Sequence, residues 1–287
     1  VYELTAGEVK AIFNRTTGWL ESYQSKGVEM LKKGYVLRPN FWRGPTDNDF
    51  GASLQVKNAV WRNPEMVLEQ LTFTPAEGEN TLPTVKALYN MPEVSAKLEM
   101  TYRMNNDGAL QVTQQLKADA SRKDVPDMFR FGMQLVMPKQ FDRIDYYGRG
   151  PEENYADRNH STFMGRYRQM VSDQFYPYVR PQETGSKSDV RWWKVVDVDG
   201  RGLAFSAEQP FFATALHYLT SDLDDGDKKH QRHSGELHER DLTCVSIDGR
   251  QMGLGCVDSW GSLPLPEYCL PYGDYTFTVV ITPIEKK

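Results

Sequence analysis

The sequence predicts an all-β protein made of antiparallel strands in two large sheets. Short stretches with strand-like alternation recur along the chain, and residues typical of turns separate them. The chain contains 22 glycines and 16 prolines, which supply such turns. Helical periodicity is confined to two short stretches. These observations favour one antiparallel sandwich of roughly ten or more strands over a helical or mixed fold.

The strands are expected at intervals from the N-terminus onward. Residues 9–13 and 19–23 flank a turn at residues 14–18, which predicts an opening hairpin. A turn-forming stretch precedes residues 110–116, and another precedes residues 275–281. The same alternation of apolar and polar residues occurs at residues 85–89 and 96–102. No linker or internal repeat interrupts this series, so residues 1–287 are expected to form a single domain.

Two stretches are the candidates for helices. Residues 51–60 and the polar stretch 216–225 are both short. The most polar part of the chain, residues 221–240, is expected to be a solvated loop and the most disordered segment.

Composition places the chain among soluble globular proteins and argues against several partners. The hydrophobic fraction is 39% and the charged fraction is 25%, and the mean hydropathy is −0.60, which is not the composition of a disordered chain. No apolar run approaches the roughly 20 residues that a membrane helix needs. With a net charge of −5, the surface repels phosphate, so neither nucleic acid nor membrane is expected as a partner.

Two further features concern the context of the chain. Cys244, Cys256 and Cys269 are too few for a disulfide scaffold and form no zinc pattern. The sequence starts at Val1 rather than at Met and shows no signal-peptide pattern, so it is expected to be a piece of a longer protein.

The first group of chemically notable residues lies at residues 40–51. Asp47 and Asp49 flank Asn48, and such a carboxylate pair could act as general acid and base or bind a hard cation. Asp and Asn in a turn more commonly bond to backbone amides, and this structural interpretation is favoured. Gly51 is a candidate hinge for a loop that runs to Trp61, since glycine absorbs large dihedral changes.

Two other groups combine charged and aromatic residues. Residues 146–158 place glycines beside an arginine but lack the order of elements and the lysine of a phosphate loop, so an ion-pair network is expected. Residues 176–185 and 191–193 interleave aromatics with charges. That pattern is typical of sugar sites and is equally common in ordinary cores.

The last group, residues 252–261, places one tryptophan among glycines and a serine. Trp260 is either a stacking platform for a ligand or a cap on the sandwich, and composition alone favours the cap. His230, His233 and His238 lie in the polar loop at a spacing that matches no zinc signature. No metal site is therefore expected.

Taken together, the motifs resemble the C-terminal domain of the large multidomain β-galactosidases of glycoside hydrolase family two. The similarity runs from the opening hairpin to the last strand, so it covers nearly the whole chain. It implies a galactose-mutarotase-like supersandwich, with residues 1–287 as a single C-terminal β-sandwich domain. The motifs are RGPTDNDFG (43–51), GRGPEENYADR (148–158), SDQFYPYVRPQETG (172–185) and MGLGCVDSW (252–260).

The resemblance also implies that the bond-breaking groups lie outside this chain. In such enzymes an acid/base glutamate and a nucleophilic glutamate sit in an upstream (β/α)₈ barrel and cleave terminal β-D-galactosides with retention. No catalytic residue, cofactor or metal is assigned to this chain, and the isolated chain is expected to be inactive. Magnesium, with sodium as a further candidate, is implied for the full-length enzyme.

By the same resemblance, this domain completes the substrate pocket. Trp260 would offer a stacking surface on the leaving-group side. Asn48 and Gly51 would belong to a second edge, residues 48–61, that closes over the substrate. The implied partners are a β-galactoside, the upstream barrel and sandwich domains, and further copies of the full enzyme. The bacterial cytoplasm and periplasm are the candidate compartments.

Two other functions stay open on sequence grounds. A stand-alone mutarotase or epimerase on the same fold would need a histidine acid and a carboxylate base, and His160, His217 and Glu183 are the available candidates. A carbohydrate-binding module would instead bind sugar weakly through exposed tryptophans.

Overall fold

Antiparallel strands make up most of the described chain. The computed structural model describes residues 1–76, 78 and 81–285. The first strands form a four-stranded sheet in the order β1-β2-β3-β4. Its strands are β1 (Tyr2–Ala6), β2 (Val9–Phe13), β3 (Leu20–Ser25) and β4 (Val28–Glu29).

The other strands of the described residues belong to one twelve-stranded sheet. Its main path runs β12-β11-β13-β14-β16-β9-β8-β7-β6, while β15, β10 and β5 continue from β14 as a branch. The bounds are β5 (Arg38–Asn40), β6 (Val67–Thr74), β7 (Thr84–Met91), β8 (Ala96–Met104), β9 (Leu110–Ala118), β10 (Arg130–Met137), β11 (Arg143–Gly150), β12 (Phe163–Met170), β13 (Lys187–Val196), β14 (Gly202–Leu216), β15 (Thr243–Gln251) and β16 (Tyr275–Ile284).

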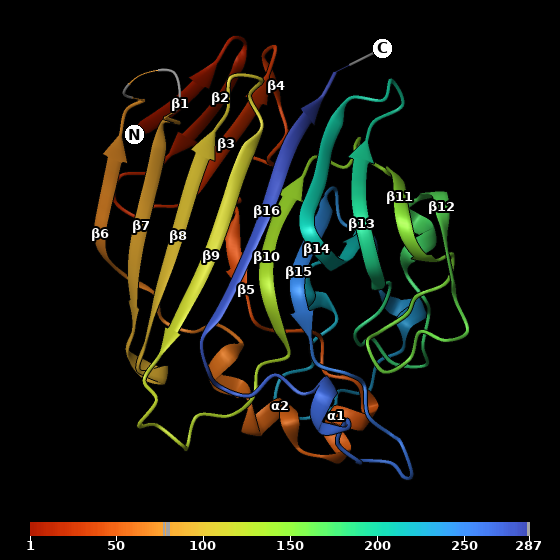
Figure 1. Cartoon of the computed structure of the whole chain (residues 1–287). Helices are drawn as coiled ribbons and strands as arrows, with labels where there is room; N and C mark the ends of the chain where they lie inside the picture. The colour runs from red at the N-terminus through yellow and green to blue at the C-terminus, as the bar shows by residue number, and fades with distance from the viewer. Residues whose placement is uncertain (77, 79–80, 286–287) are drawn as a thin grey trace.

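The long strand β14 divides the large sheet into two layers. Its first part, residues 202–206, pairs with β16, and its last part, residues 212–216, pairs with β15. The pairing with β13 shifts register between the two parts, and such a bulge bends a strand. The branch β15-β10-β5 therefore lies behind the front layer that contains β6 to β9 and β16 (Figure 1).

One core joins the layers and the small sheet. Buried and outward residues alternate along β8 and β9, as the period of a half-buried strand requires. Phe131 of β10 packs against Tyr275 of β16, with ring centroids 5.2 Å apart. Phe13 of β2 packs against Tyr102 of β8 at 4.8 Å. The all-β antiparallel prediction is thus confirmed, with a hydrogen-bonded sheet that curls to form both layers.

The predicted strands are confirmed, and one helix prediction is not. Residues 51–60 hold short helical turns: α1 (Asp47–Gly51), α2 (Leu54–Lys57) and a 3₁₀ turn at Ala59–Trp61. The helix expected at residues 216–225 is wrong, because this stretch ends β14 and continues as a 3₁₀ turn at Thr220–Asp222. The Asp222 carboxylate accepts a hydrogen bond from the Leu219 N–H at 2.8 Å, which favours a single capped turn over a longer helix.

Residues 221–240 are mostly exposed, as the prediction of a solvated loop requires. The segment is irregular, but acidic side chains fix it to the body of the domain. Asp224 accepts a hydrogen bond from the Trp42 indole at 2.8 Å. Asp225, which is only 6% exposed, pairs with Arg180 and Arg232. These contacts hold the loop beside the α1 region.

The short helices and the loop at residues 253–262 gather at one end of the molecule. Figure 1 shows α1 and α2 at the bottom, beside this blue C-terminal loop, whereas the N-terminal hairpin lies at the opposite end. Within the described residues, no helix has the length and apolar character that crossing a membrane would require. The sequence motifs around Asn48 and Trp260 therefore meet at this end.

Candidate functional site

The motif at residues 43–51 folds as a buried ion pair followed by a capped helical turn. Arg43 donates to the Asp49 carboxylate through Nε at 3.0 Å and Nη2 at 2.7 Å, and both side chains are almost fully buried. Asp49 also accepts from the Thr46 N–H at 2.8 Å, while the Thr46 hydroxyl accepts from the Asp49 N–H at 3.1 Å. This capping box satisfies the first turn of α1. The favoured structural interpretation of Asp49 fits this geometry.

Asp47 faces the other way and serves as a charged acceptor. Its carboxylate accepts from Lys229 at 2.6 Å, Arg180 at 3.0 Å and Gln182 at 3.1 Å. Burial alone would raise the pKa of Asp47, but these three donors lower it below its ordinary value. Asp47 and Asp49 are thus held by separate sets of cations and do not form a shared-proton pair.

Asn48 ties α1 to the loop that carries Trp260. Its Nδ2 donates to the carbonyl oxygens of Leu254 at 3.0 Å and Ser262 at 2.8 Å. Its Oδ1 accepts from the Gly261 N–H at 2.6 Å and from the Cys256 thiol. Both amide hydrogens are used, so Asn48 acts as a clamp on this loop. Its direct contact with a substrate stays a prediction.

Gly51 lies where two backbones touch. A Cβ atom at Gly51 would come within 2.8 Å of the Gly261 Cα and 2.8 Å of the Trp260 ring. The Asp157 carboxylate also anchors this loop, because it accepts from the N–H groups of Leu254 and Gly255, each at 2.9 Å. The structure therefore shows a packing reason for glycine at position 51, and the hinge role stays a prediction.

The indole nitrogen of Trp260 makes a hydrogen bond within the chain, whereas its ring is exposed to solvent. The indole Nε1 donates to the Asp47 carbonyl oxygen at 3.0 Å, and the side chain is 66% exposed. The Lys229 ammonium lies 5.8 Å from the ring centroid. A cap on the sandwich would be buried, so the cap interpretation of Trp260 is wrong.

The exposed ring borders a cavity of about 670 Å³. A cavity of this size falls in the range that holds small-molecule ligands. Its polar wall comes from α1, from the 148–158 motif and from the 172–185 motif, so three of the four motifs meet the fourth here. The lining residues are Thr46, Asp47, Asn48, Asp157, Arg158, Tyr178, Gln182, Glu183, Leu254, Gly255, Cys256, Val257, Trp260, Leu265 and Tyr268.

Glu183 forms the charged floor of this cavity. It pairs with Arg130, which also donates to Asp248 at 2.6 Å, and all three side chains are buried. Burial raises the pKa of Glu183 to about 7, although Arg130 and Arg43 oppose the shift. Burial likewise raises the pKa of Asp248. Sequence inspection missed Arg130 and Asp248, because 118 residues separate partners that only the pairing of β10 with β15 brings together.

The ion-pair network expected at residues 146–158 is present. Glu153 accepts from Arg158, from the Tyr178 hydroxyl and from the Gly185 N–H. This carboxylate joins the second and third motifs along one wall of the cavity. Trp193, from the third group, is fully buried and belongs to the core.

The residues named for a mutarotase are not brought together. Glu183 lines the Trp260 cavity, whereas neither His160 nor His217 does. The His217 ring is buried and its Nδ1 lies 2.7 Å from the Leu242 carbonyl oxygen, while His160 is exposed. Among the described residues, no group of three or more His, Cys, Asp or Glu side chains is arranged to hold a metal ion.

Comparison with known proteins identifies the family. The profile of the β-galactosidase small chain family matches residues 5–281. The chain belongs to the β-galactosidase small chain family. It is 33% identical over 281 residues to a β-galactosidase of Priestia megaterium, and 34% identical over 269 residues to one of Lactobacillus delbrueckii subsp. bulgaricus. These matches cover 97% and 93% of this chain but 26% and 25% of the relatives, so this small chain spans about a quarter of their length.

A solved structure supports the fold of this small chain. A galactose mutarotase related enzyme from Lactobacillus acidophilus superimposes with a TM-score of 0.53 at 11% sequence identity. The match covers 100% of the small chain and 98% of that enzyme. The galactose-mutarotase-like fold is therefore confirmed. At this identity the likeness concerns the fold alone.

Proposed function

We propose that this chain is the C-terminal domain of a β-galactosidase that hydrolyses terminal β-D-galactosides with retention, and that it completes the aglycone side of the substrate pocket. Membership of the small chain family supports the proposal. So does the coverage, since the chain spans about a quarter of relatives that are β-galactosidases.

The exposed ring of Trp260 is the observation that carries this proposal. Trp260 is 66% exposed, and Val257 and Leu263 of the same loop are exposed as well, so this loop presents several apolar side chains together, as interaction surfaces do. A flat aromatic face excludes water from the apolar side of a pyranose, and nearby polar groups can bond to its hydroxyls. Asn48 donates hydrogen bonds to two carbonyl oxygens of the loop that carries Trp260. Its proposed role is therefore to position Trp260.

The carboxylates of this chain are poor candidates for the reacting pair. Retention requires two carboxyl groups about 5–5.5 Å apart, one free to attack and one free to donate a proton. Three carboxylates line the cavity, and each is already bound within the chain. Asp47 pairs with Lys229 and Arg180. Asp157 accepts from two backbone N–H groups, and Glu183 pairs with Arg130. The reacting glutamates are therefore assigned to the part of the enzyme beyond this chain, and the isolated chain is proposed to be inactive.

Other parts of the proposal concern the longer enzyme. Its proposed partners are the β-galactoside substrate, an upstream (β/α)₈ barrel with accompanying sandwich domains, and further copies of the enzyme. Magnesium, with sodium as a further candidate, is proposed for that remainder. Residues 48–61 are proposed as a second edge that closes over the substrate, with Gly51 as its hinge.

Hydrolysis of a chromogenic β-galactoside tests the proposal. Activity is expected in the full-length enzyme and absent from the 287-residue chain. Trp260→Ala in the full-length enzyme should slow transfer to acceptor sugars and alter aglycone preference by roughly tenfold, while bond cleavage persists.

The matched control is Trp192→Ala, which removes a half-buried indole on β13 that contacts Arg166 and Lys194 instead of the cavity. The control should keep the wild-type preference. Turnover by the isolated chain, or an equal effect of the two substitutions, would contradict the proposed role. Saturable sugar binding at the Trp260 cavity of the isolated chain would favour a carbohydrate-binding module instead.

A further inference from the structure

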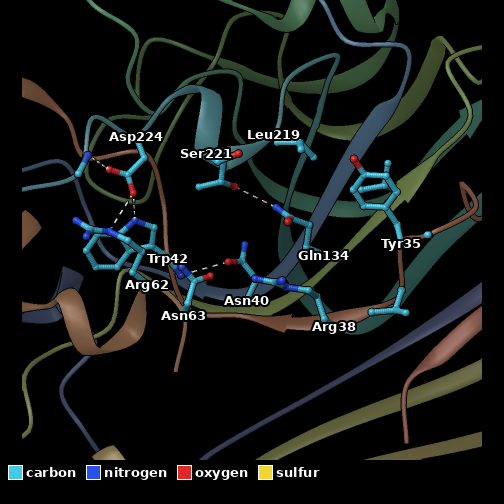
Figure 2. A pocket seen from close by; sticks show the side chains of 15 residues that line it. Tyr35, Arg38, Asn40, Trp42, Arg62, Asn63, Gln134, Leu219, Ser221 and Asp224 are labelled. Atoms are coloured by element: carbon cyan, nitrogen blue, oxygen red, sulfur yellow. Dashed lines mark hydrogen bonds and ion pairs between the residues drawn. The ribbon is translucent and has the colours of Figure 1, made fainter. Parts of the chain in front are cut away.

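A second cavity lies outside the proposed pocket. It has a volume of about 490 Å³, and none of its lining residues lines the Trp260 cavity. β5 and the residues that follow it present Arg38, Asn40 and Trp42 to this space, whereas Phe41 lies in the core. Figure 2 shows Tyr35 and Trp42 toward opposite ends of the cavity, with Asn40 and Gln134 between them. The family motifs do not account for this space.

Two amide side chains offer complementary free groups here. The Asn40 Oδ1 accepts from the Trp42 N–H at 3.2 Å, which fixes the orientation of the amide and leaves Nδ2 without a partner among the described residues. Gln134 uses Nε2 to donate to Thr220 at 3.2 Å and Ser246 at 3.1 Å, so its Oε1 is left as an acceptor. The register pairs Arg38 with Gln134 and places Asn40 diagonally beside them. A donor and an acceptor thus stand on one sheet face, roughly 7–8 Å apart at the backbone.

Further polar side chains on the wall are also uncommitted. The side chains of Asn63 and Ser221 line the cavity, and neither makes a hydrogen bond with another residue of the described chain. Both side chains are exposed, so water satisfies them in the free chain and ligand hydroxyls can replace that water. The Asn40 Nδ2 differs, because it is buried, and a buried donor without a partner is costly. Such a donor beside exposed polar groups on one cavity wall is the arrangement expected of a binding site.

The charge of the wall favours a neutral ligand. Arg62 is paired with Asp224 at 3.1 Å and Asp227 at 3.2 Å, and the Asp224 carboxylate faces the cavity (Figure 2). That carboxylate opposes the entry of an anion, and Arg38 is the one cation of the wall without an ion pair among the described residues. Amide donors and acceptors match hydroxyl groups, each of which can donate and accept.

The shape of the space favours more than one sugar ring. A smaller lobe of about 170 Å³ adjoins the main cavity and shares its wall. The shared residues are Val36, Arg38, Asn40, Arg62 and Asn63. Trp19, which stacks on Tyr89 with centroids 4.2 Å apart, lines this lobe.

We propose that the cavity between β5, β10 and the turn at Thr220–Asp222 is a second saccharide site, which binds a neutral disaccharide or longer glycan through Asn40 Nδ2 and Gln134 Oε1. The site is separate from the proposed hydrolytic pocket and needs no contribution from the rest of the enzyme. Its role is to hold glycan on the domain, not to react with it.

Titration of the 287-residue chain with lactose and with galactose, followed by calorimetry and saturation-transfer NMR, tests the site. Saturable binding is expected, tighter for lactose. Asn40→Asp keeps the acceptor for the Trp42 N–H but removes the free donor, so binding should weaken about tenfold. Asn63→Trp should block the cavity and abolish binding, and Trp260→Ala should leave it unchanged.

Thermal unfolding of each variant shows whether it still folds. If Asn40→Asp does not fold, the loss of binding in Asn63→Trp still tests the site. Three results would overturn the proposal: no saturable binding by the wild-type chain, binding that survives both cavity substitutions, or binding that Trp260→Ala abolishes. The chromogenic assay of the full-length enzyme is a separate measurement, so failure of the second site and failure of the proposed function are distinguishable.

Discussion

At the residue scale, the ionisation of Glu183 links the floor of the Trp260 cavity to the buried core. Two guanidinium groups, Arg43 and Arg130, share this region with three carboxyl groups, Asp49, Glu183 and Asp248. With all three carboxyls ionised, the network carries one excess negative charge in a buried site, which is unfavourable. Protonation of Glu183 balances it, and this agrees with a Glu183 pKa raised to about 7.

Glu183→Gln should therefore remove a pH dependence of stability. The pKa of Glu183 is raised in the folded chain from an ordinary value of 4.5 to about 7. The stability that its protonation contributes is fully present below pH 4.5 and is lost as the pH rises through about 7. From pH 5 to pH 8, the free energy of unfolding of the wild type should fall relative to that of Glu183→Gln by on the order of 1–3 kcal/mol.

Urea unfolding across this pH range measures the difference. Glu208→Gln, a change at an exposed site on β14, should follow the wild-type curve and is the control. Parallel curves for the wild type and Glu183→Gln would contradict the assignment.

Individual site residues differ in how far the sequence predicts them. Asp49 and Glu153 follow from local rules, because turn carboxylates bond to nearby amides and arginines. The exposure of Trp260 does not follow from local rules, because composition favours burial of tryptophan. Its exposed position depends on contacts with distant residues, such as the hydrogen bond from its indole to the Asp47 carbonyl oxygen. Arg130 lies in no motif, and its partners lie on other elements, so no local signal marks it.

At the element scale, the contact between α1 and the loop at residues 253–262 controls where Trp260 lies. Gly51→Ala should displace the loop, because the new Cβ would meet backbone atoms of Gly261 that have no freedom to rotate away. We expect a loss of about 1–3 kcal/mol in the free energy of unfolding. Acrylamide quenching of Trp260 fluorescence should increase, with a Trp260→Phe chain used to subtract the other tryptophans.

The control for this prediction is Gly235→Ala, because a Cβ at Gly235 would meet nothing within 4 Å. That variant should keep the wild-type stability and quenching. Unchanged quenching in Gly51→Ala would mean that the loop position does not depend on this contact.

Regular elements were more predictable from sequence than irregular ones. The strands at residues 96–102 and 110–116 have a clear period of two, and it matches the buried face of β8 and β9. Residues 216–225 lack a comparable pattern, and tertiary pairing of β14 with β15 determines where the strand ends. The polar composition of residues 221–240 likewise conceals Asp225, whose burial depends on arginines from other parts of the chain.

At the scale of the whole molecule, the sequence predicts the two layers but not how the chain divides between the sheets. Alternating strands require a second apolar surface, so a sandwich follows from pattern alone. The bend in β14 does not follow from pattern, because its opposing partners β16 and β15 come later in the chain. The N-terminal sheet was similarly unpredictable as a separate unit, since its attachment depends on side chains such as Tyr23.

Tyr23 is expected to fasten the small sheet to the large one. Its buried hydroxyl lies 2.8 Å from the Gly108 carbonyl oxygen and 3.0 Å from the Ile281 carbonyl oxygen, so it donates a shared hydrogen bond to the end of the large sheet. Tyr23→Phe should lower the free energy of unfolding by about 1–2 kcal/mol, because it leaves these acceptors without that donor.

Tyr102→Phe is the matched control in urea unfolding. The Tyr102 hydroxyl is buried and has no hydrogen-bond partner among the described residues. Its removal relieves an unsatisfied polar group and should be neutral or stabilising. The two substitutions delete the same atom from the same shared core, so a difference between them isolates the bond that Tyr23 makes across the sheets. Equal effects would mean that apolar packing, and not this hydrogen bond, holds the N-terminal sheet in place.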